Sequence, residues 1–198
     1  MPMIKYKHVL ALNPYFGRSA DMRGLFPPTG LEYIAASMKG LVGKVTVFDL
    51  RHEKPYQDPK VLSAFVRREI DLVCVSVVWQ SRFERVCDFI AQLPPEGPII
   101  VGGYQATLEV ETVFGRCPNI AAIVRGEGEE IIKQVVTGVP FEEIRGLSYR
   151  RDGQIVHNAN QVLPSLDHIA YPDRSLRRHE YYWGRNDLRY SRPPSTRS

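Results

Sequence analysis

The sequence predicts an α/β fold, namely a flavodoxin-like (Rossmann-like), doubly wound sheet of five parallel strands. Short apolar runs alternate with helical patterns along most of the chain. This alternation is typical of parallel sheets with helices on both faces and right-handed crossovers. The clearest run, Leu72–Val78, is continuously apolar and rich in valine, as expected of a strand that is covered on both sides. A β-hairpin and an extended C-terminal linker are expected to follow the sheet.

Each predicted strand is a short apolar run that ends in a loop or turn. The five strands are expected at Val9–Leu12, Val45–Asp49, Leu72–Val78, Pro98–Val101 and Ile120–Val124.

The helices between the strands are predicted from apolar spacing and from start signals. Thr29 and Glu32 have the spacing of a capping box before an apolar face. Asp58 and Pro59 have the order of an N-cap and a first-turn proline. The remaining helices are expected to begin near Ser81, which with Glu84 repeats the capping-box spacing, near Thr107, and at Glu127.

The last third of the chain changes in character. Two strand-like runs, Leu147–Tyr149 and Ile155–His157, flank an Asp-Gly pair at residues 152–153, which indicates a hairpin. The regular pattern ends at Asn158. We therefore expect an α/β domain over residues 1–142, a hairpin appendage over 143–160 and a linker over 161–198.

Composition excludes several classes of protein. The chain has 198 residues, of which 43% are hydrophobic and 24% are charged, as in ordinary soluble globular domains. The apolar runs are too short to span a bilayer, and the first residues lack the apolar stretch of a secretory signal. Three widely spaced cysteines suggest neither a disulfide framework nor a zinc site, so a cytoplasmic setting is expected.

Charge is unevenly distributed. From Arg174 onward there are seven arginines and two acidic residues, whereas the rest of the chain is close to neutral. A basic tail can bind nucleic acid, but it can equally pack against a protein surface that this chain does not contain. The tail lacks regularly spaced aromatic residues, so nucleic acid is the less favoured partner.

The loops that follow the strands form the candidate site, because ligands of open α/β sheets bind beyond the carboxyl ends of the strands. Four loops are rich in glycine, proline or small polar residues: Asn13–Pro28, Ser76–Ser81, Gly102–Thr107 and Arg125–Glu129. Any one of them could be a simple turn, but four at one edge favour a ligand site. Dinucleotide, P-loop and serine-nucleophile motifs are absent from the sequence.

Taken together, these loops resemble a known family, the cobalamin-binding domains that precede radical S-adenosylmethionine catalytic domains. Pro27–Ala35 resembles the stretch P-P-x-G-L-x-Y-[LI]-A of that family, Val101–Thr107 its V-G-G-x-x-[AP]-T loop, and Val124–Glu129 its V-x-G-E-G-E turn. Ile144–Arg150 resembles the hairpin that follows, and Leu166–Arg174 resembles the linker. The ordered set covers nearly the whole chain.

Two departures from the wider family bear on the expected chemistry. The cobalt-ligating D-x-H-x-x-G motif of some cobalamin domains is absent, as it often is in members tied to radical chemistry. The C-x3-C-x2-C motif that opens the catalytic half and holds a [4Fe–4S] cluster is also absent. The absence of the cluster motif predicts a fragment cut before its catalytic domain, with a basic tail that would pack against the missing part.

The resemblance implies a cobalamin-binding module of a radical S-adenosylmethionine enzyme, a methyltransferase or ring-forming enzyme in full length. Cobalamin would bind base-off, without a histidine ligand. The [4Fe–4S] cluster and S-adenosylmethionine would belong to a C-terminal radical domain, so this chain alone would not be catalytic. The alternatives are a stand-alone flavodoxin-like carrier of another ligand and, less favoured, a nucleic-acid-associated domain. No membrane partner is expected.

Each loop has a physical reason to contact the cofactor. Gly102 and Gly103 let the backbone approach a ligand closely, and Ser76 is small enough to hydrogen-bond a ring nitrogen. The N–H groups near Gly126 and Gly128 can meet polar groups. The family architecture implies that Trp79 lies under the corrin ring, although a core or interdomain aromatic is an equal alternative. The residues expected to contact cobalamin are Asn13, Pro14, Tyr15, Pro28, Thr29, Gly30, Ser76, Val77, Val78, Trp79, Gly102, Gly103, Tyr104, Gln105, Ala106, Thr107, Gly126, Glu127, Gly128 and Glu129.

Overall fold

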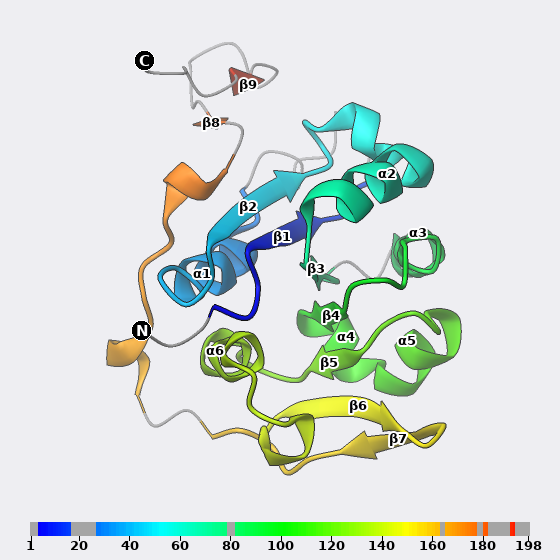
Figure 1. Cartoon of the computed structure of the whole chain (residues 1–198), viewed down its shortest axis with the longest axis vertical. Helices are drawn as coiled ribbons and strands as arrows, with labels where there is room; N and C mark the ends of the chain where they lie inside the picture. Colours follow the sequence, from blue (N-terminus) through cyan, green and yellow to red (C-terminus); the bar gives the residue numbers. More distant parts are fainter. Residues whose placement is uncertain are drawn as a thin grey trace.

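A computed structural model of the protein describes residues 4–16, 27–78, 82–162, 165–177, 180–181 and 191–192. Within them, seven strands form one sheet in the order β2-β1-β3-β4-β5-β6-β7 (Figure 1). The first five pair in parallel and the last two are antiparallel. The strands are β1 His8–Asn13, β2 Lys44–Asp49, β3 Leu72–Ser76, β4 Ile99–Gly102, β5 Ala122–Val124, β6 Leu147–Arg151 and β7 Gln154–His157, and a separate pair consists of β8 Glu180–Tyr181 and β9 Ser191–Arg192.

This sheet confirms the predicted fold class and adds one feature to it. The expected hairpin forms around Asp152 and Gly153, whose φ angles are 51° and 79°, as a tight two-residue turn requires. Strand β6 also pairs antiparallel with β5, with Ala122 opposite Tyr149. The hairpin therefore continues the parallel sheet and covers the edge that β5 would otherwise expose.

Helices cover both faces of the sheet (Figure 1). One face packs against α1 and α6, and the other packs against α2, α3 and α5, so that two apolar layers enclose the strands. The helices are α1 Thr29–Ser37, α2 Pro59–Glu69, α3 Phe83–Ile90, α4 Tyr104–Leu108, α5 Val110–Arg116 and α6 Glu129–Thr137, with short 3-10 helices at Lys54–Gln57, Phe141–Glu143, Leu166–His168 and Arg174–Leu176.

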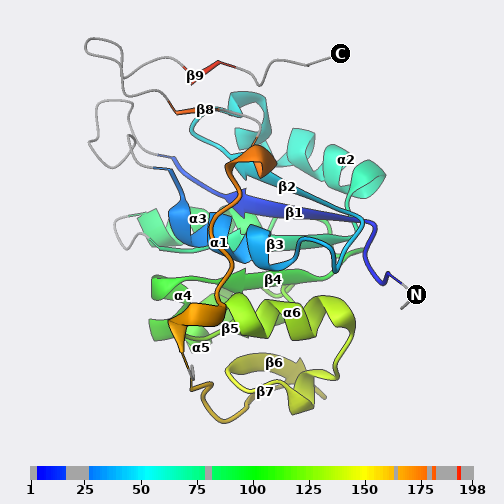
Figure 2. The same cartoon turned by 90° about the vertical axis from the view of Figure 1, so that its left-hand side faces the viewer.

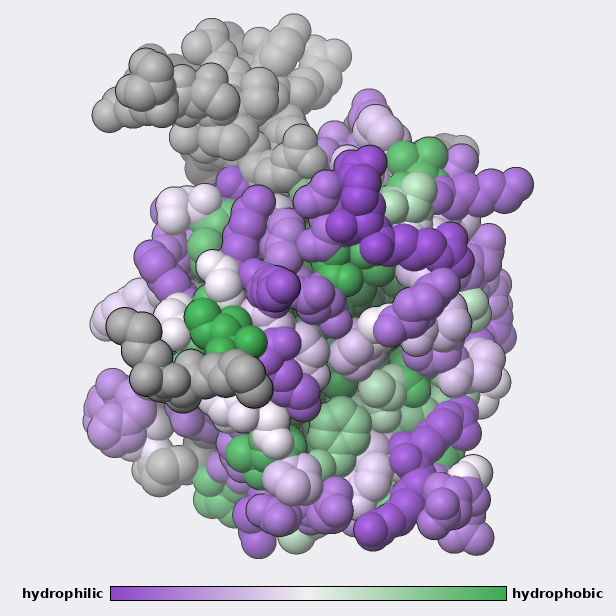
Figure 3. Space-filling view, in the orientation of Figure 1, coloured by the Kyte–Doolittle hydropathy of each residue, from purple (hydrophilic) through white to green (hydrophobic). Residues whose placement is uncertain are grey.

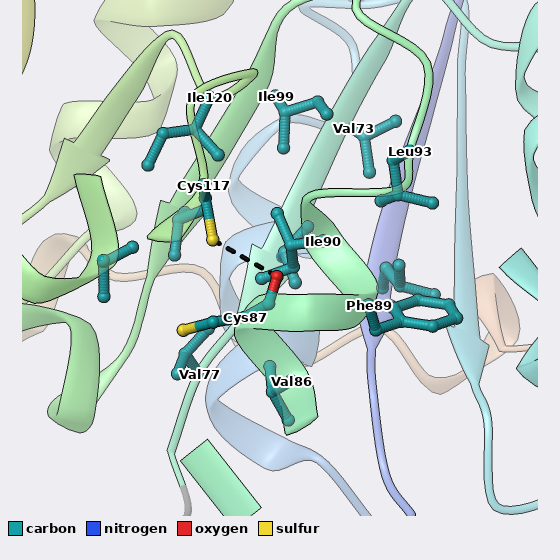
Figure 4. Close-up of a cluster of buried hydrophobic side chains, with 14 of the residues drawn as sticks. Val73, Val77, Val86, Cys87, Phe89, Ile90, Leu93, Ile99, Cys117 and Ile120 are labelled. Atoms are coloured by element: carbon teal, nitrogen blue, oxygen red, sulfur yellow. Dashed lines mark hydrogen bonds between the residues drawn. The ribbon is translucent and has the colours of Figure 1, made fainter. Parts of the chain in front are cut away.

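The core beneath α3 and α5 contains two of the three cysteines (Figure 4). Cys87 and Cys117 are fully buried, and the thiol of Cys117 donates to the backbone oxygen of Cys87 at 3.4 Å. Cys74 is buried on β3, and all three cysteines are free thiols. They therefore act as small apolar side chains in the packing.

The outer surface is mostly polar on the face shown in Figure 3, where apolar side chains appear only in small patches among hydrophilic ones. None of the helices in the described ranges combines the length and the apolarity that a bilayer-spanning helix needs.

The predicted helix starts at Asp58 and near Thr29 are both confirmed, but the capping box expected of Thr29 and Glu32 does not form. The Asp58 side chain accepts a hydrogen bond from the Lys60 N–H at 2.8 Å, as an N-cap does. Pro28 occupies the N-cap position of α1 without a side-chain hydrogen bond, and Thr29 is the first helical residue. The Glu32 side chain is buried instead of reaching back to the helix start. Ser81, the other predicted cap, lies outside the described residues.

Two other predicted boundaries shift because the backbone near the site makes its own hydrogen bonds. Strand β3 ends at Ser76 rather than at Val78. Beyond it, the Val77 carbonyl accepts the N–H of Gln105 at 3.0 Å, which holds the first turn of α4 against the end of β3. Helix α4 consequently begins at Tyr104, three residues before the predicted start.

The first part of the basic tail packs on the domain itself. We call residues 165–177 the strap; Figure 2 shows it crossing the outside of α1 toward β2. Arg177 forms an isolated bridge with Val47 of the outer strand β2, and its Nε lies 3.1 Å from Oε1 of the buried Glu32. The expectation that the tail packs against a missing domain is therefore wrong for Arg177, because a buried carboxyl group of α1 needs its charge.

Candidate functional site

The carboxyl ends of β3, β4 and β5 border a pocket of about 320 Å³. Figure 2 looks onto the face of the sheet that α1 and α6 cover, with the carboxyl ends of the parallel strands at the left. The pocket lies between these strand ends and the first turns of α1 and α6. Its walls are formed by Gly30, Leu31, Ile34, Cys74, Val75, Ser76, Val78, Ile100, Val101, Gly102, Gly103, Tyr104, Thr107, Val124, Gly126, Glu127, Gly128, Glu129 and Ile132.

Three of the four predicted loops, together with the first turn of α1, contribute to this wall. The predicted residues that line it are Gly30, Ser76, Val78, Gly102, Gly103, Tyr104, Thr107, Gly126, Glu127, Gly128 and Glu129. Other predicted residues belong to the same segments but do not line the pocket, namely Pro28, Thr29, Val77, Gln105 and Ala106. Asn13, Pro14 and Tyr15 follow β1 and are also absent from the wall. Trp79 lies outside the described residues.

The sequence interpretation missed the apolar walls of the pocket. These residues are Leu31, Ile34, Cys74, Val75, Ile100, Val101, Val124 and Ile132. Most of them are buried and have the spacing of ordinary core residues. Burial of the Cys74 thiol raises its pKa to about 12, so this side chain is neutral and adds to the apolar character of the wall.

Gly103 shapes the loop after β4 through its backbone. Its φ of 103° is one that side-chain-bearing residues rarely adopt. A Cβ atom at this position would lie 2.8 Å from the Val77 carbonyl oxygen. The glycine is therefore required by the close approach of two loops, whereas the approach of a ligand was the role predicted from the sequence.

Gly102 differs from its neighbour because it has room for a side chain. Its φ is not positive, and the atom nearest to an added Cβ would be the Val124 Cβ at an ordinary 3.6 Å. Its missing side chain leaves space in the pocket.

Thr107 joins two of the loops at the pocket. Its hydroxyl group donates to the Gly103 carbonyl oxygen at 3.1 Å and accepts the Gly126 N–H at 3.1 Å. The turn after β5 is thus fixed to the turn after β4 by one side chain. Thr107 has this role because it lies one turn into α4, where its hydroxyl group reaches the Gly103 carbonyl oxygen at the start of the helix.

Gly128 lets the first turn of α6 approach α1. A Cβ at this position would lie 2.9 Å from the Ile34 Cδ1 and 3.1 Å from the Val124 Cγ1. Because these two apolar side chains belong to the pocket wall, the glycine sets the width of the pocket at this point.

Glu129 is the buried acidic residue of the wall. It is the first residue of α6, its side chain is only 7% exposed, and its Oε2 atom has no hydrogen-bond partner among the described residues. Burial raises the pKa of Glu129, and the negative charge of Glu127 adds to the rise, while backbone N–H groups at the helix start oppose it. The pocket therefore combines apolar walls with one carboxyl oxygen whose hydrogen-bonding capacity is unused.

The ends of β1 and β2 are arranged differently. The Asn13 amide donates to Asp49 at 3.2 Å, and the Arg51 Nε donates to both oxygens of Asp49 at 2.8 Å. The Arg51 guanidinium also lies 5.5 Å from the centroid of the Tyr15 ring, within the range of a cation–π contact. These polar groups bind one another.

Comparison with solved structures supports the fold. A radical S-adenosylmethionine methyltransferase, TsrM from Kitasatospora setae, superposes with a TM-score of 0.62 at 20% identity, over 77% of this chain and 30% of that one. The cobalamin-dependent S-adenosylmethionine radical enzyme OxsB, solved with aqua-cobalamin, superposes with a TM-score of 0.61 at 18% identity, over 80% of this chain and 23% of that one.

Sequence relatives and a family profile give the relationship. An uncharacterized methyltransferase of Pyrococcus horikoshii is 25% identical over 76% of this chain, and an anaerobic magnesium-protoporphyrin IX monomethyl ester cyclase of Rubrivivax gelatinosus is 26% identical over 88%. The chain spans about a third of the length of each, 34% and 33%. The profile described as B12 binding domain matches residues 18–136. The chain therefore belongs to the B12-binding domain family.

Proposed function

We propose that this chain binds cobalamin, with the nucleotide tail of the cofactor in the pocket between the ends of β3–β5, α1 and α6. The observation that carries the proposal is the pocket itself. Its volume of about 320 Å³ is at the lower end of the range of small-molecule sites. Apolar walls suit a flat bicyclic base, and the absent side chain of Gly102 leaves room for it.

The proposed contacts are the sequence-predicted residues. Those that line the pocket would surround the tail, with Ser76 and the N–H groups near Gly126 and Gly128 available to its polar atoms. Asn13, Pro14, Tyr15, Pro28, Thr29, Val77, Gln105 and Ala106 would support or flank the corrin ring, and Trp79 would lie on its lower side. When bound, cobalamin supplies a cobalt centre that can carry a methyl group or tune a radical reaction.

We further propose that the cofactor binds base-off and without a histidine on cobalt. The proposal is supported by the sequence, which contains no D-x-H-x-x-G motif, and by a pocket that could hold the base away from the metal. Electron paramagnetic resonance of the cob(II)alamin form measures this directly. Spectra without superhyperfine splitting from an axial nitrogen are expected, and a nitrogen splitting would contradict base-off binding.

The larger protein context is also a proposal. The relatives are about three times longer than the matched region, and both solved neighbours are radical S-adenosylmethionine enzymes. We propose that residues 1–142 bind the cofactor, that the hairpin over 143–160 closes the sheet, and that residues 161–198 lead to a radical domain. That domain would hold the [4Fe–4S] cluster and S-adenosylmethionine of a methyltransferase or ring-forming enzyme.

Titration of the purified chain with hydroxocobalamin tests cobalamin binding. We expect about one corrin per chain to co-elute in gel filtration, detected by its visible absorbance. Folded protein that elutes without corrin would overturn the proposal. A bound flavin with its yellow absorbance would instead identify a flavodoxin-like carrier.

A further inference from the structure

The Oε2 atom of Glu129 is a buried polar atom that the described part of the protein leaves without a hydrogen bond. The Glu129 side chain is more than nine-tenths buried, with 7% exposure, and it lines the pocket. Buried polar atoms in folded proteins almost always have a partner. A buried, unsatisfied atom on a residue that lines a pocket points to a ligand that supplies the missing hydrogen bond.

Neighbouring charged side chains are engaged elsewhere. On α6, the Lys133 ammonium binds the Glu130 carboxylate at 2.6 Å. On the loop before α6, the Arg125 guanidinium binds the side chain of Asn160 at 2.7 Å and also the Asn158 carbonyl. The remaining neighbour, Glu127, is itself acidic, so these flanking side chains supply no cation to Glu129.

The chemistry of the missing partner follows from the surroundings of the carboxyl group. Burial raises the pKa of Glu129 and so increases the population of its protonated form at a given pH. The protonated carboxyl group is a hydrogen-bond donor. The Thr107 hydroxyl on the same wall already bridges two backbone groups. Glu129 is therefore placed to share a proton with a nitrogen atom of an otherwise apolar ligand edge.

We propose that Glu129 determines the specificity of the pocket for the lower base of the cofactor, because its carboxyl group shares one hydrogen bond with the free imidazole-type nitrogen of a benzimidazole base. This inference rests on the proposed cobalamin function. The ribose hydroxyl groups of the tail are the other possible source of a hydrogen bond, and the test separates the two.

The experiment compares two cobamides that differ in the lower base. Cobalamin has a benzimidazole nitrogen, whereas a cobamide with p-cresol in its place has no ring nitrogen but keeps the ribose. Dissociation constants are measured by absorbance titration for the wild type, Glu129→Leu and the matched control Glu129→Gln. We expect Glu129→Leu to weaken cobalamin binding about 10-fold, the size of one net hydrogen bond, and to change p-cresolyl cobamide binding less than about twofold.

Glu129→Gln should bind cobalamin within about threefold of the wild type, since its amide still donates a hydrogen bond. An equal loss for both cobamides would assign Glu129 to the ribose, and an unchanged cobalamin affinity in Glu129→Leu would remove it from the site; either result overturns the inference. Thermal unfolding of each apo variant checks the fold, and Glu129→Met replaces Glu129→Leu if the latter does not fold. If the wild type binds both cobamides, the variants test this inference alone. If the wild type binds neither cobamide, the proposed function is overturned as well.

Discussion

The carboxyl edge of the sheet has two halves that are built differently. At the ends of β1 and β2, Asn13, Asp49 and Arg51 bind one another, and the strap adds the buried pair of Arg177 and Glu32. At the ends of β3, β4 and β5, the loops enclose an apolar pocket, and an oxygen of Glu129 on its wall has no partner among the described residues.

The difference separates stability from binding of the nucleotide tail. In the closed half, at β1 and β2, charged and polar groups pair with one another, so a substitution there should change the free energy of unfolding. In the open half, at β3–β5, glycines and apolar side chains leave space, so a substitution there should change ligand affinity with little effect on stability. The following variants test this separation, beginning with the largest expected effect.

Filling the pocket should abolish binding. Gly102→Phe adds a large ring at a position with ordinary space for a Cβ. We expect cobalamin affinity to fall at least about 100-fold, or about 2.7 kcal/mol, because the ring occupies the volume assigned to the tail. Absorbance titration measures the affinity, and urea denaturation should show a free energy of unfolding within about 1 kcal/mol of the wild type.

Gly102→Ala is the matched control, because a methyl group adds little volume and should retain most of the affinity. Wild-type affinity in Gly102→Phe would show that the ligand does not occupy this pocket.

Breaking the buried ion pair of the closed half should lower the stability of the fold and leave cobalamin affinity nearly unchanged. Arg177→Met leaves the carboxyl group of Glu32, which is 1% exposed, without its 3.1 Å partner. Removing one member of a buried ion pair costs about 3 kcal/mol. Urea denaturation should therefore show a large loss of stability, with cobalamin affinity changed less than about threefold.

The double variant Glu32→Leu with Arg177→Met distinguishes a charge effect from a packing effect. It should recover part of the lost stability, because a buried pair replaced by apolar side chains is often neutral. Additive losses would show that the pair is not the source of the effect.

The layered fold could be predicted because each strand carries its own local signal. Continuous apolar runs such as Leu72–Val78 identified all five parallel strands to within two residues. The Asp-Gly turn likewise predicted the pairing of β6 with β7. The pairing of β6 with β5 was not predicted, because its register depends on which apolar faces meet in three dimensions.

The site could be predicted only where the backbone imposes a residue type. Gly103 and Gly128 marked the edge of the pocket, since few other residues fit at these two positions. The wall residues Leu31 and Ile34 have the spacing of a core-facing helix, and such a spacing does not distinguish a pocket wall from a packed core. The contact between Glu32 and Arg177 joins positions far apart in the chain and leaves no local signal.

Loss of the Thr107 hydrogen bond that links two loops of the open half should weaken cobalamin binding moderately. Thr107→Val keeps the shape of the side chain but removes the oxygen that accepts the Gly126 N–H at 3.1 Å. The net loss of one hydrogen bond is about 1 kcal/mol, and we expect it to appear as a several-fold weaker cobalamin affinity. Thr107→Ser, which keeps the hydroxyl group, should bind like the wild type; equal weakening in both variants would show that the hydroxyl group is not the source of the effect.

The exposed ion pair between Lys39 and Asp173 of the strap should contribute least to stability, and its contribution should depend on pH. The Lys39 ammonium binds Asp173 at 2.5 Å, and this bond, with those from Ser175, lowers the pKa of Asp173 to about 2. Since Lys39 is 66% exposed, Lys39→Met should cost less than about 1 kcal/mol. An unfolded aspartate has a pKa of about 3.9, so the pair stabilises the fold fully above that pH and loses its effect as the pH falls through 2.

Urea midpoints of the wild type and Lys39→Met should therefore differ slightly at about pH 5 and converge near pH 2. Convergence is expected because protonation of Asp173 removes in the wild type the attraction that the substitution removes in the variant. A difference at the higher pH as large as that of Arg177→Met would mean that the strap is held as firmly at its exposed pair as at its buried one. Stability would then not follow burial in the closed half, and its contrast with the open half would need another explanation.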